Sequence, residues 1–115
     1  MARPTRPIAW IKAAQRDFED FPHEAQARVL DALTIAAEGS KADIAKPFKG
    51  FGSGVFEIAF AYRGNAYRII YAVQLGTDIW VIHAFQKKSK TGIKTPREDI
   101  EVIRVRLRRL QEVLS

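Results

Sequence analysis

The chain has 115 residues, a formal net charge of +6, no cysteine and only two histidines, His23 and His83. This length predicts a single domain over residues 1–115. The lack of cysteine excludes thiolate metal sites, and the two separated histidines give no indication of a metal or a cofactor. The sequence contains no apolar run of about 18 residues, so no membrane span is expected. The N-terminus does not resemble a signal peptide, so a cytoplasmic location is expected. The positive charge favours a polyanionic partner such as RNA, DNA or an acidic protein.

The first third of the chain predicts one strand and two helices. The apolar run Ile8–Ile11 follows a proline, as an edge strand can. An amphipathic pattern indicates a helix over Lys12–Asp20, and Pro22 suits the first position of a second helix, Pro22–Glu38, which Gly39 ends. We expect these two helices to form an antiparallel hairpin whose apolar face covers a sheet.

Residues 39–54 predict a loop rich in glycine, lysine and serine. Phe48 and Phe51 should anchor this loop to the body of the protein, and its lysines should stay in solvent: Lys41, Lys46 and Lys49. A basic loop with aromatic side chains is suited to pair with phosphates and stack on bases. The same composition also suits a solvated connector, and both interpretations stay open.

The middle of the chain predicts three strands in a meander. Val55–Arg63 alternates large apolar residues with small or charged ones, and Gly64-Asn65 is a tight-turn pair. Tyr67–Leu75 continues the alternation. The third run, Ile79–Phe85, is apolar on both sides, so its pattern does not show which residues face which way.

Glu57 and Arg68 should share the less apolar face of this meander. An unpaired cation beside buried strands would be costly, so Arg68 is expected to face a groove, a partner or an anion. Glu57 is either a candidate general base or a cross-strand partner of Arg68 or Arg63.

The last element is a helix with a strong start signal. Thr95-Pro96-Arg97-Glu98 combines an N-cap threonine, a proline at the first position and a capping-box glutamate. A seam of apolar residues follows at helical spacing: Ile100, Ile103, Leu107, Leu110 and Leu114. The predicted order is β-α-α-β-β-β-α, an α+β fold with a twisted antiparallel sheet, all helices packed on one face and the other face open.

Nearly the whole chain resembles the RelE/ParE superfamily of type II toxins, and most closely its HigB-like, phage-derived branch. The main matching segments are Val55-Phe56-Glu57-Ile58, Ala66-Tyr67-Arg68-Ile69-Ile70-Tyr71, His83-Ala84-Phe85-Gln86-Lys87-Lys88-Ser89 and Gly92-Ile93-Lys94-Thr95-Pro96. The resemblance implies a small RelE-like fold, cleavage of mRNA in the ribosomal A site, and neutralisation by a cognate antitoxin, expected to be a helix-turn-helix protein. By position, it implies that Arg68 contacts the scissile phosphate and that Lys87 supplies a second cation.

Two departures from the RelE pattern leave alternatives open. Glu57 and Ala59 stand where RelE has lysines, and the C-terminal tyrosine used there has no clear counterpart. The general base is therefore open. The superfamily also contains toxins that inhibit DNA gyrase without cutting RNA, so a ParE-type toxin and an inactive phage-derived binding protein are the alternatives.

Metal-free RNA cleavage needs a base, an acid and cations that stabilise the phosphorane. The candidate catalytic residues are Arg68, Lys87, Lys88, His83 and Glu57, and the candidate RNA-binding residues are Lys46, Lys49, Lys90 and Arg63. His83 has a suitable intrinsic pKa for acid–base catalysis, but a single histidine in an apolar strand is also a common core residue. The two adjacent lysines suit either phosphate contact or protection of a strand edge.

Overall fold

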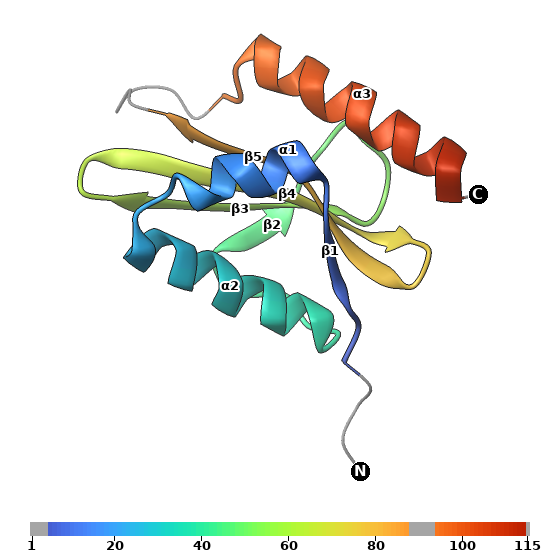
Figure 1. Ribbon diagram of the computed structural model, residues 1–115, viewed down its shortest axis with the longest axis horizontal. Coiled ribbons are helices and arrows are strands. Elements are labelled where there is room, and N and C mark those ends of the chain that lie inside the picture. The colour runs from blue at the N-terminus through green and yellow to red at the C-terminus, as the bar shows by residue number, and fades with distance from the viewer. Residues whose placement is uncertain (1–4, 88–93, 115) are drawn as a thin grey trace.

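The computed structural model describes residues 5–87 and 94–114, and within them a five-stranded sheet is combined with three helices (Figure 1). The elements are β1 (Ile8–Trp10), α1 (Lys12–Glu19), α2 (His23–Ala37), β2 (Ala45–Pro47), β3 (Val55–Tyr62), β4 (Asn65–Leu75), β5 (Asp78–Lys87) and α3 (Arg97–Leu114). The strand order is β1-β5-β4-β3-β2. The predicted α+β class and the predicted meander of β3, β4 and β5 are confirmed.

The β3–β4 hairpin forms as its alternation predicts, but its turn lies one residue earlier than expected. Tyr62 pairs with Asn65, so the two-residue loop is Arg63-Gly64 and not Gly64-Asn65. Both loop residues have positive φ, 50° and 84°. This is the backbone that the right-handed twist of a tight hairpin requires, and glycine adopts it without strain.

Two short strands complete the sheet at its edges. β1 is the predicted edge strand, and it pairs with β5 in parallel, so the sheet is mixed and not antiparallel throughout. β2 lies inside the segment that was predicted to be only a loop, and it pairs antiparallel with β3. Its sequence, Ala45-Lys46-Pro47, has no alternating pattern, and it is ordered by the free edge that β3 offers.

One face of the sheet is covered by α1 and α2, as predicted for this helix pair. Phe18 of α1 and Val29 and Leu33 of α2 are buried against sheet residues such as Ile58 and Ile69. Burial of each side chain of this size contributes on the order of 1.5–3 kcal/mol. This layer is the larger of the two cores.

The expectation that all helices pack on one face is wrong, because α3 lies on the opposite face (Figure 1). The apolar seam of α3 places Ile103 and Leu107 against Val55, Ile70 and Ile82 of the sheet. The strands also carry apolar residues on this second face, and α3 is the helix that shields them from solvent. Beside β2, the start of this seam at Ile100 borders a groove that is also lined by Glu57 and Arg68.

A bulge in β5 settles the direction of its side chains. Ile70 pairs with His83 while Tyr71 pairs with Val81, so Ile82 is an extra residue in the ladder. Beyond the bulge, Phe85 opposes Arg68 and Lys87 opposes Ala66. Because cross-strand partners point to the same side of a sheet, Lys87 shares the face that carries Arg68.

Candidate functional site

A groove with a volume of about 860 Å³ opens on the face of the sheet that α3 partly covers. Its walls come from β2 with the loop after it and from the segment that enters α3, and its floor comes from β3 and β4. The lining residues are Lys46, Pro47, Phe48, Lys49, Glu57, Arg68, Lys94, Thr95 and Ile100. Four of these side chains are cationic and one is a carboxylate, so the groove suits an anion.

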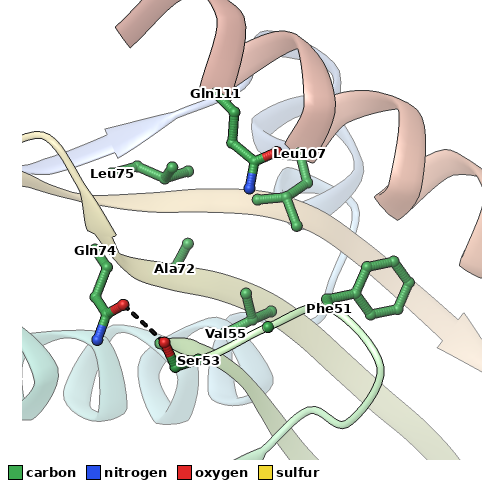
Figure 2. Close-up of a pocket in the computed structure, with 10 residues that line it drawn as sticks. Phe51, Ser53, Val55, Ala72, Gln74, Leu75, Leu107 and Gln111 are labelled. Atoms are coloured by element: carbon green, nitrogen blue, oxygen red, sulfur yellow. Dashed lines mark hydrogen bonds between the residues drawn. The ribbon is translucent and has the colours of Figure 1, made fainter. Parts of the chain in front are cut away.

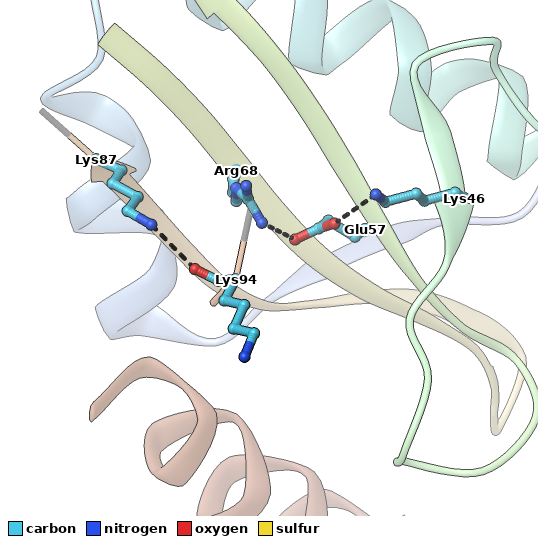
Figure 3. A network of polar contacts seen from close by, with 5 residues as sticks. All are labelled: Lys46, Glu57, Arg68, Lys87 and Lys94. Carbon is cyan, nitrogen blue, oxygen red and sulfur yellow. Dashed lines mark hydrogen bonds and ion pairs between the residues drawn. The ribbon is translucent and has the colours of Figure 1, made fainter. Parts of the chain in front are cut away.

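Arg68 and Glu57 form a buried ion pair on the floor of this groove (Figure 3). Arg68 Nη1 donates to Glu57 Oε2 at 3.0 Å, and the two residues are only 7% and 2% exposed. Lys46 lies directly opposite Glu57 across the β2–β3 ladder, with its Nζ 3.8 Å from Glu57 Oε1. The predicted shared face and the predicted pairing of Glu57 with Arg68 are therefore observed. The carboxylate lies between a buried guanidinium and an exposed ammonium.

Lys87 lies at the end of β5 and connects this strand to the wall of the groove. Its Nζ donates to the backbone oxygen of Lys94 at 3.0 Å, and Lys94 is a lining residue (Figure 3). The bond holds the end of the strand against the segment that leads into α3. The other two lysines predicted in this region, Lys88 and Lys90, lie outside the described residues.

His83 is not a lining residue of the groove, because it lies under α3. Its Nδ1 is 3.1 Å from Nη1 of Arg106, and its Nε2 is 2.7 Å from Oδ1 of Asp99. A guanidinium can only donate, so Nδ1 accepts and Nε2 carries the proton that is donated to Asp99. Burial lowers the pKa of His83, the hydrogen bond that His83 donates to Asp99 opposes this shift, and the charge of Arg106 adds to it. The imidazole is therefore neutral and joins β5 to α3.

Sequence reasoning missed both partners of His83. Asp99 and Arg106 are seven residues apart, which puts them on the same side of α3. Arg106 also donates to the backbone oxygen of Ile82, the bulge residue, at 3.1 Å. The spacing of seven residues indicates that the two side chains lie on the same side of a helix. It does not identify His83 as their partner, because the sequence does not show that α3 covers the second face of the sheet.

The predicted RNA-binding residues separate into two groups. Lys46 and Lys49 line the groove. Arg63 lies in the β3–β4 turn, where its guanidinium is 5.2 Å from the ring centroid of Tyr62. Tyr62 belongs to the opposite face, since its hydroxyl donates to Glu24 of α2 at 2.7 Å. The structure thus gathers Arg68, Glu57, Lys46 and Lys49 in one groove with Lys87 at its border, and it does not bring His83 or Arg63 into it.

A second, smaller cavity of about 260 Å³ lies between α3 and the loop that enters β3 (Figure 2). Gln74, Ser53 and Gln111 contribute its polar side chains, and Ser53 Oγ donates to Gln74 Oε1 at 3.0 Å. Within the described ranges, its lining includes no lysine, arginine or acidic residue. It therefore lacks the charge that makes the groove suitable for an anion.

Across residues 5–87 and 94–114, no group of three or more His, Cys, Asp or Glu side chains is placed to hold a metal ion. In the same ranges, no helix combines the length and the apolar character needed to cross a membrane.

Comparisons with known proteins agree with the fold. The model of the family described as Phage derived protein Gp49-like (DUF891) matches residues 16–108. Among solved structures, the toxin–antitoxin complex RelBE2 from Mycobacterium tuberculosis matches with a TM-score of 0.50 and 20% sequence identity, over 74% of this chain and 94% of that chain. No curated protein sequence matches. The expected resemblance to a phage-derived family with a RelE-like fold is confirmed.

Proposed function

Because the chain belongs to the phage-derived Gp49-like family, we propose that it is the toxin of a type II toxin–antitoxin system and an endoribonuclease that cleaves mRNA on the ribosome. The observation that supports this proposal best is the groove, which places four cationic side chains and one carboxylate around a space open to a polyanion. The fold shared with a toxin of known structure is consistent with it. Such a toxin would act in the cytoplasm, where mRNA is translated.

The proposed chemistry uses side chains and water. The ribose 2′-hydroxyl gives up its proton to a base as its oxygen attacks the adjacent phosphorus. The bond from phosphorus to the 5′-oxygen of the next nucleotide breaks, and this oxygen takes up a proton from a lysine ammonium group or from water, so that a 2′,3′-cyclic phosphate and a 5′-hydroxyl are formed. Arg68 offers planar donors to the phosphate, and Lys87 and Lys46 offer point charges that stabilise the dianionic phosphorane. Each preorganised donor of this kind contributes on the order of a hundredfold in rate.

Among the described residues that line the groove, Glu57 is the only carboxylate, so it is the base that we propose for the 2′-hydroxyl. Its burial and its bond to Arg68 mean that a phosphate and the carboxylate compete for the same guanidinium. We assign no direct catalytic part to His83, because both of its ring nitrogens are engaged beneath α3.

The antitoxin proposed for this toxin is a protein with an acidic segment. A carboxylate-rich segment laid along the groove would complement its lysines and would exclude RNA from it. We propose the neighbouring gene, encoding a short helix-turn-helix protein, as its source.

Expression in a bacterial host tests the proposed function. Induction of the wild type should arrest growth and produce new mRNA 5′ ends at ribosome-occupied codons, detected by primer extension on a reporter mRNA. Lys87→Ala should abolish both effects. Arg109→Ala is the matched control, because Arg109 is an exposed cation on α3 outside the groove. An mRNA that stays intact during wild-type expression would refute the nuclease assignment.

A gyrase-inhibiting toxin is the second candidate, and the Arg68–Glu57 pair is the feature that favours it. Arg68 is 7% exposed and its guanidinium is bonded to a carboxylate, so it is less accessible to phosphate than a solvent-facing cation. A DNA supercoiling assay separates the two candidates. Inhibition of gyrase by the purified protein, together with intact mRNA in cells, would support the second.

A further inference from the structure

A stack of planar groups begins at the groove with Phe48 and extends away from it. The rings of Phe48 and Phe51 are stacked, with their centroids 5.3 Å apart and an interplanar angle of 17°. The guanidinium of Arg104 on α3 lies 5.3 Å from the centroid of Phe51, on an adjoining element. Phe48 is half-buried and lines the groove, whereas Phe51 and Arg104 do not.

The backbone holds the Phe48 ring in place. Phe48 directly follows β2, and its backbone nitrogen donates to the oxygen of Val55 at 2.8 Å. The ring therefore belongs to a paired segment with a stacked neighbour behind it. A ring fixed in this way loses little conformational entropy when a ligand packs on it.

Cations flank this ring on both sides in the sequence. Lys46 and Lys49 line the same groove, and Lys46 is two residues before Phe48, which in an extended strand is a separation of about 7 Å. An aromatic ring and two ammonium groups that line the same groove suit the two parts of a nucleotide, a flat base and a phosphate. Single-stranded nucleic acids are bound in this way, with stacking on aromatic rings and pairing of the backbone with cations.

We propose that Phe48 is a stacking platform for one base of the single-stranded RNA, with Lys46 and Lys49 holding the phosphates beside it. This inference rests on the proposed function, because it places the RNA of that function in the same groove, and it adds a base-binding subsite. The platform accepts any base by stacking, and it sets the position of the strand relative to Arg68.

Binding of a non-cleavable RNA tests the platform directly. The probe is a fluorescein-labelled single-stranded RNA of about eight nucleotides, with 2′-O-methyl groups that block attack by the 2′-oxygen, and the readout is anisotropy over a range of salt concentrations. Phe48→Leu keeps an apolar side chain but removes the ring, and it should weaken binding roughly 5- to 150-fold. The slope of log K against log salt should not change, because the charge is unchanged. Phe48→Tyr should restore the affinity.

Two controls fix the interpretation. Lys49→Ala should weaken binding and make the salt slope shallower by about 0.7, the value for one phosphate contact on a single strand. Phe56→Leu is the matched aromatic control, because Phe56 is stacked on Tyr71 with the same interplanar angle, 17°, but on the opposite face of the sheet. It should bind the probe as the wild type does.

A second measurement does not depend on how well the variant folds. With the wild-type protein, an abasic ribose placed at each position of the probe in turn should reduce the affinity at one position more than at the others. Equal affinity of folded Phe48→Leu and wild type, or no sensitive position, would overturn the platform. If the wild type binds no free RNA but its growth arrest still requires Lys87, the platform is wrong and the proposed function survives. If it binds RNA through Phe48 and no mRNA is cut in cells, the platform survives and the nuclease assignment does not.

Discussion

Glu57 and Arg68 lie on neighbouring strands and are joined by a 3.0 Å hydrogen bond that is almost completely shielded from solvent. Glu57 is opposite Ile70 and Arg68 is opposite Ala59, so the two side chains meet diagonally across the β3–β4 ladder. A buried pair of this kind is costly to break from one side, because the remaining charge is left without compensation. The groove thus has a charged floor that is part of the fold as well as of the proposed site.

The first prediction concerns the stability of this pair. Arg68→Ala and Glu57→Ala should each lower the free energy of unfolding by about 3–5 kcal/mol. The double variant should lose less than the sum of the two, because it leaves neither charge alone in the interior. Urea unfolding of the four proteins gives the coupling free energy. Strict additivity would contradict the pairing.

The second prediction concerns pH, and it follows from the lowered pKa of His83. The unfolded chain takes up a proton at His83 near the ordinary value of 6.5, while the folded protein does so only at lower pH. The unfolded state therefore binds more protons below pH 6.5, and the free energy of unfolding should fall as the pH decreases through that window.

Urea midpoints at about pH 7.5 and about pH 5.5 measure this effect. Replacing the imidazole in His83→Gln should remove much of the difference between the two midpoints. His23→Gln is the control, because His23 is exposed at the start of α2. A pH dependence that His83→Gln leaves unchanged would show that another group is responsible.

The third prediction concerns Gly54, which precedes β3 beside the smaller cavity. Its φ is 80°, and a Cβ at this position would lie 2.7 Å from Cδ and Cγ of Gln74. Gly54→Ala should therefore cost the strain of a left-handed backbone, about 1–2 kcal/mol, and a displacement of Gln74 in addition.

Gly52→Ala separates the two costs, because Gly52 has a similar φ of 84° and open space around its Cβ. Thermal unfolding should rank the wild type above Gly52→Ala and Gly52→Ala above Gly54→Ala. Adding Gln74→Ala to Gly54→Ala should recover most of the difference between the two alanine variants, because it removes Cγ and Cδ and leaves only the Cβ of residue 74, 3.1 Å away. Equal melting temperatures for Gly52→Ala and Gly54→Ala would contradict the predicted clash.

The groove floor could be predicted from the sequence, because strand alternation has a strict period of two. Once β3 and β4 form a hairpin, a shift of the turn by one residue leaves Glu57 and Arg68 on the same face. The direction of Lys87 could not be predicted in this way. It depends on the bulge at Ile82, and a strand that is apolar on both sides carries no signal for an extra residue.

The walls of the groove could not be predicted, because they come from tertiary contacts. β2 has three residues and is ordered by pairing with β3, so its local sequence indicates a loop. The seam of α3 shows that Ile103 is buried but not against which face of the sheet. Asp99 and Arg106 acquire their role as partners of His83 only through that choice of face.

The chemistry of the mRNA ends produced in cells tests the central claim most directly. Expression of the wild type should yield new upstream fragments ending in a 2′,3′-cyclic phosphate and downstream fragments beginning with a 5′-hydroxyl, both identified by end-specific ligation. These ends should disappear with Lys87→Ala and persist with Arg109→Ala. Growth arrest by the wild type without such ends, or with ends that Lys87→Ala leaves at full yield, would contradict an endoribonuclease built on this groove.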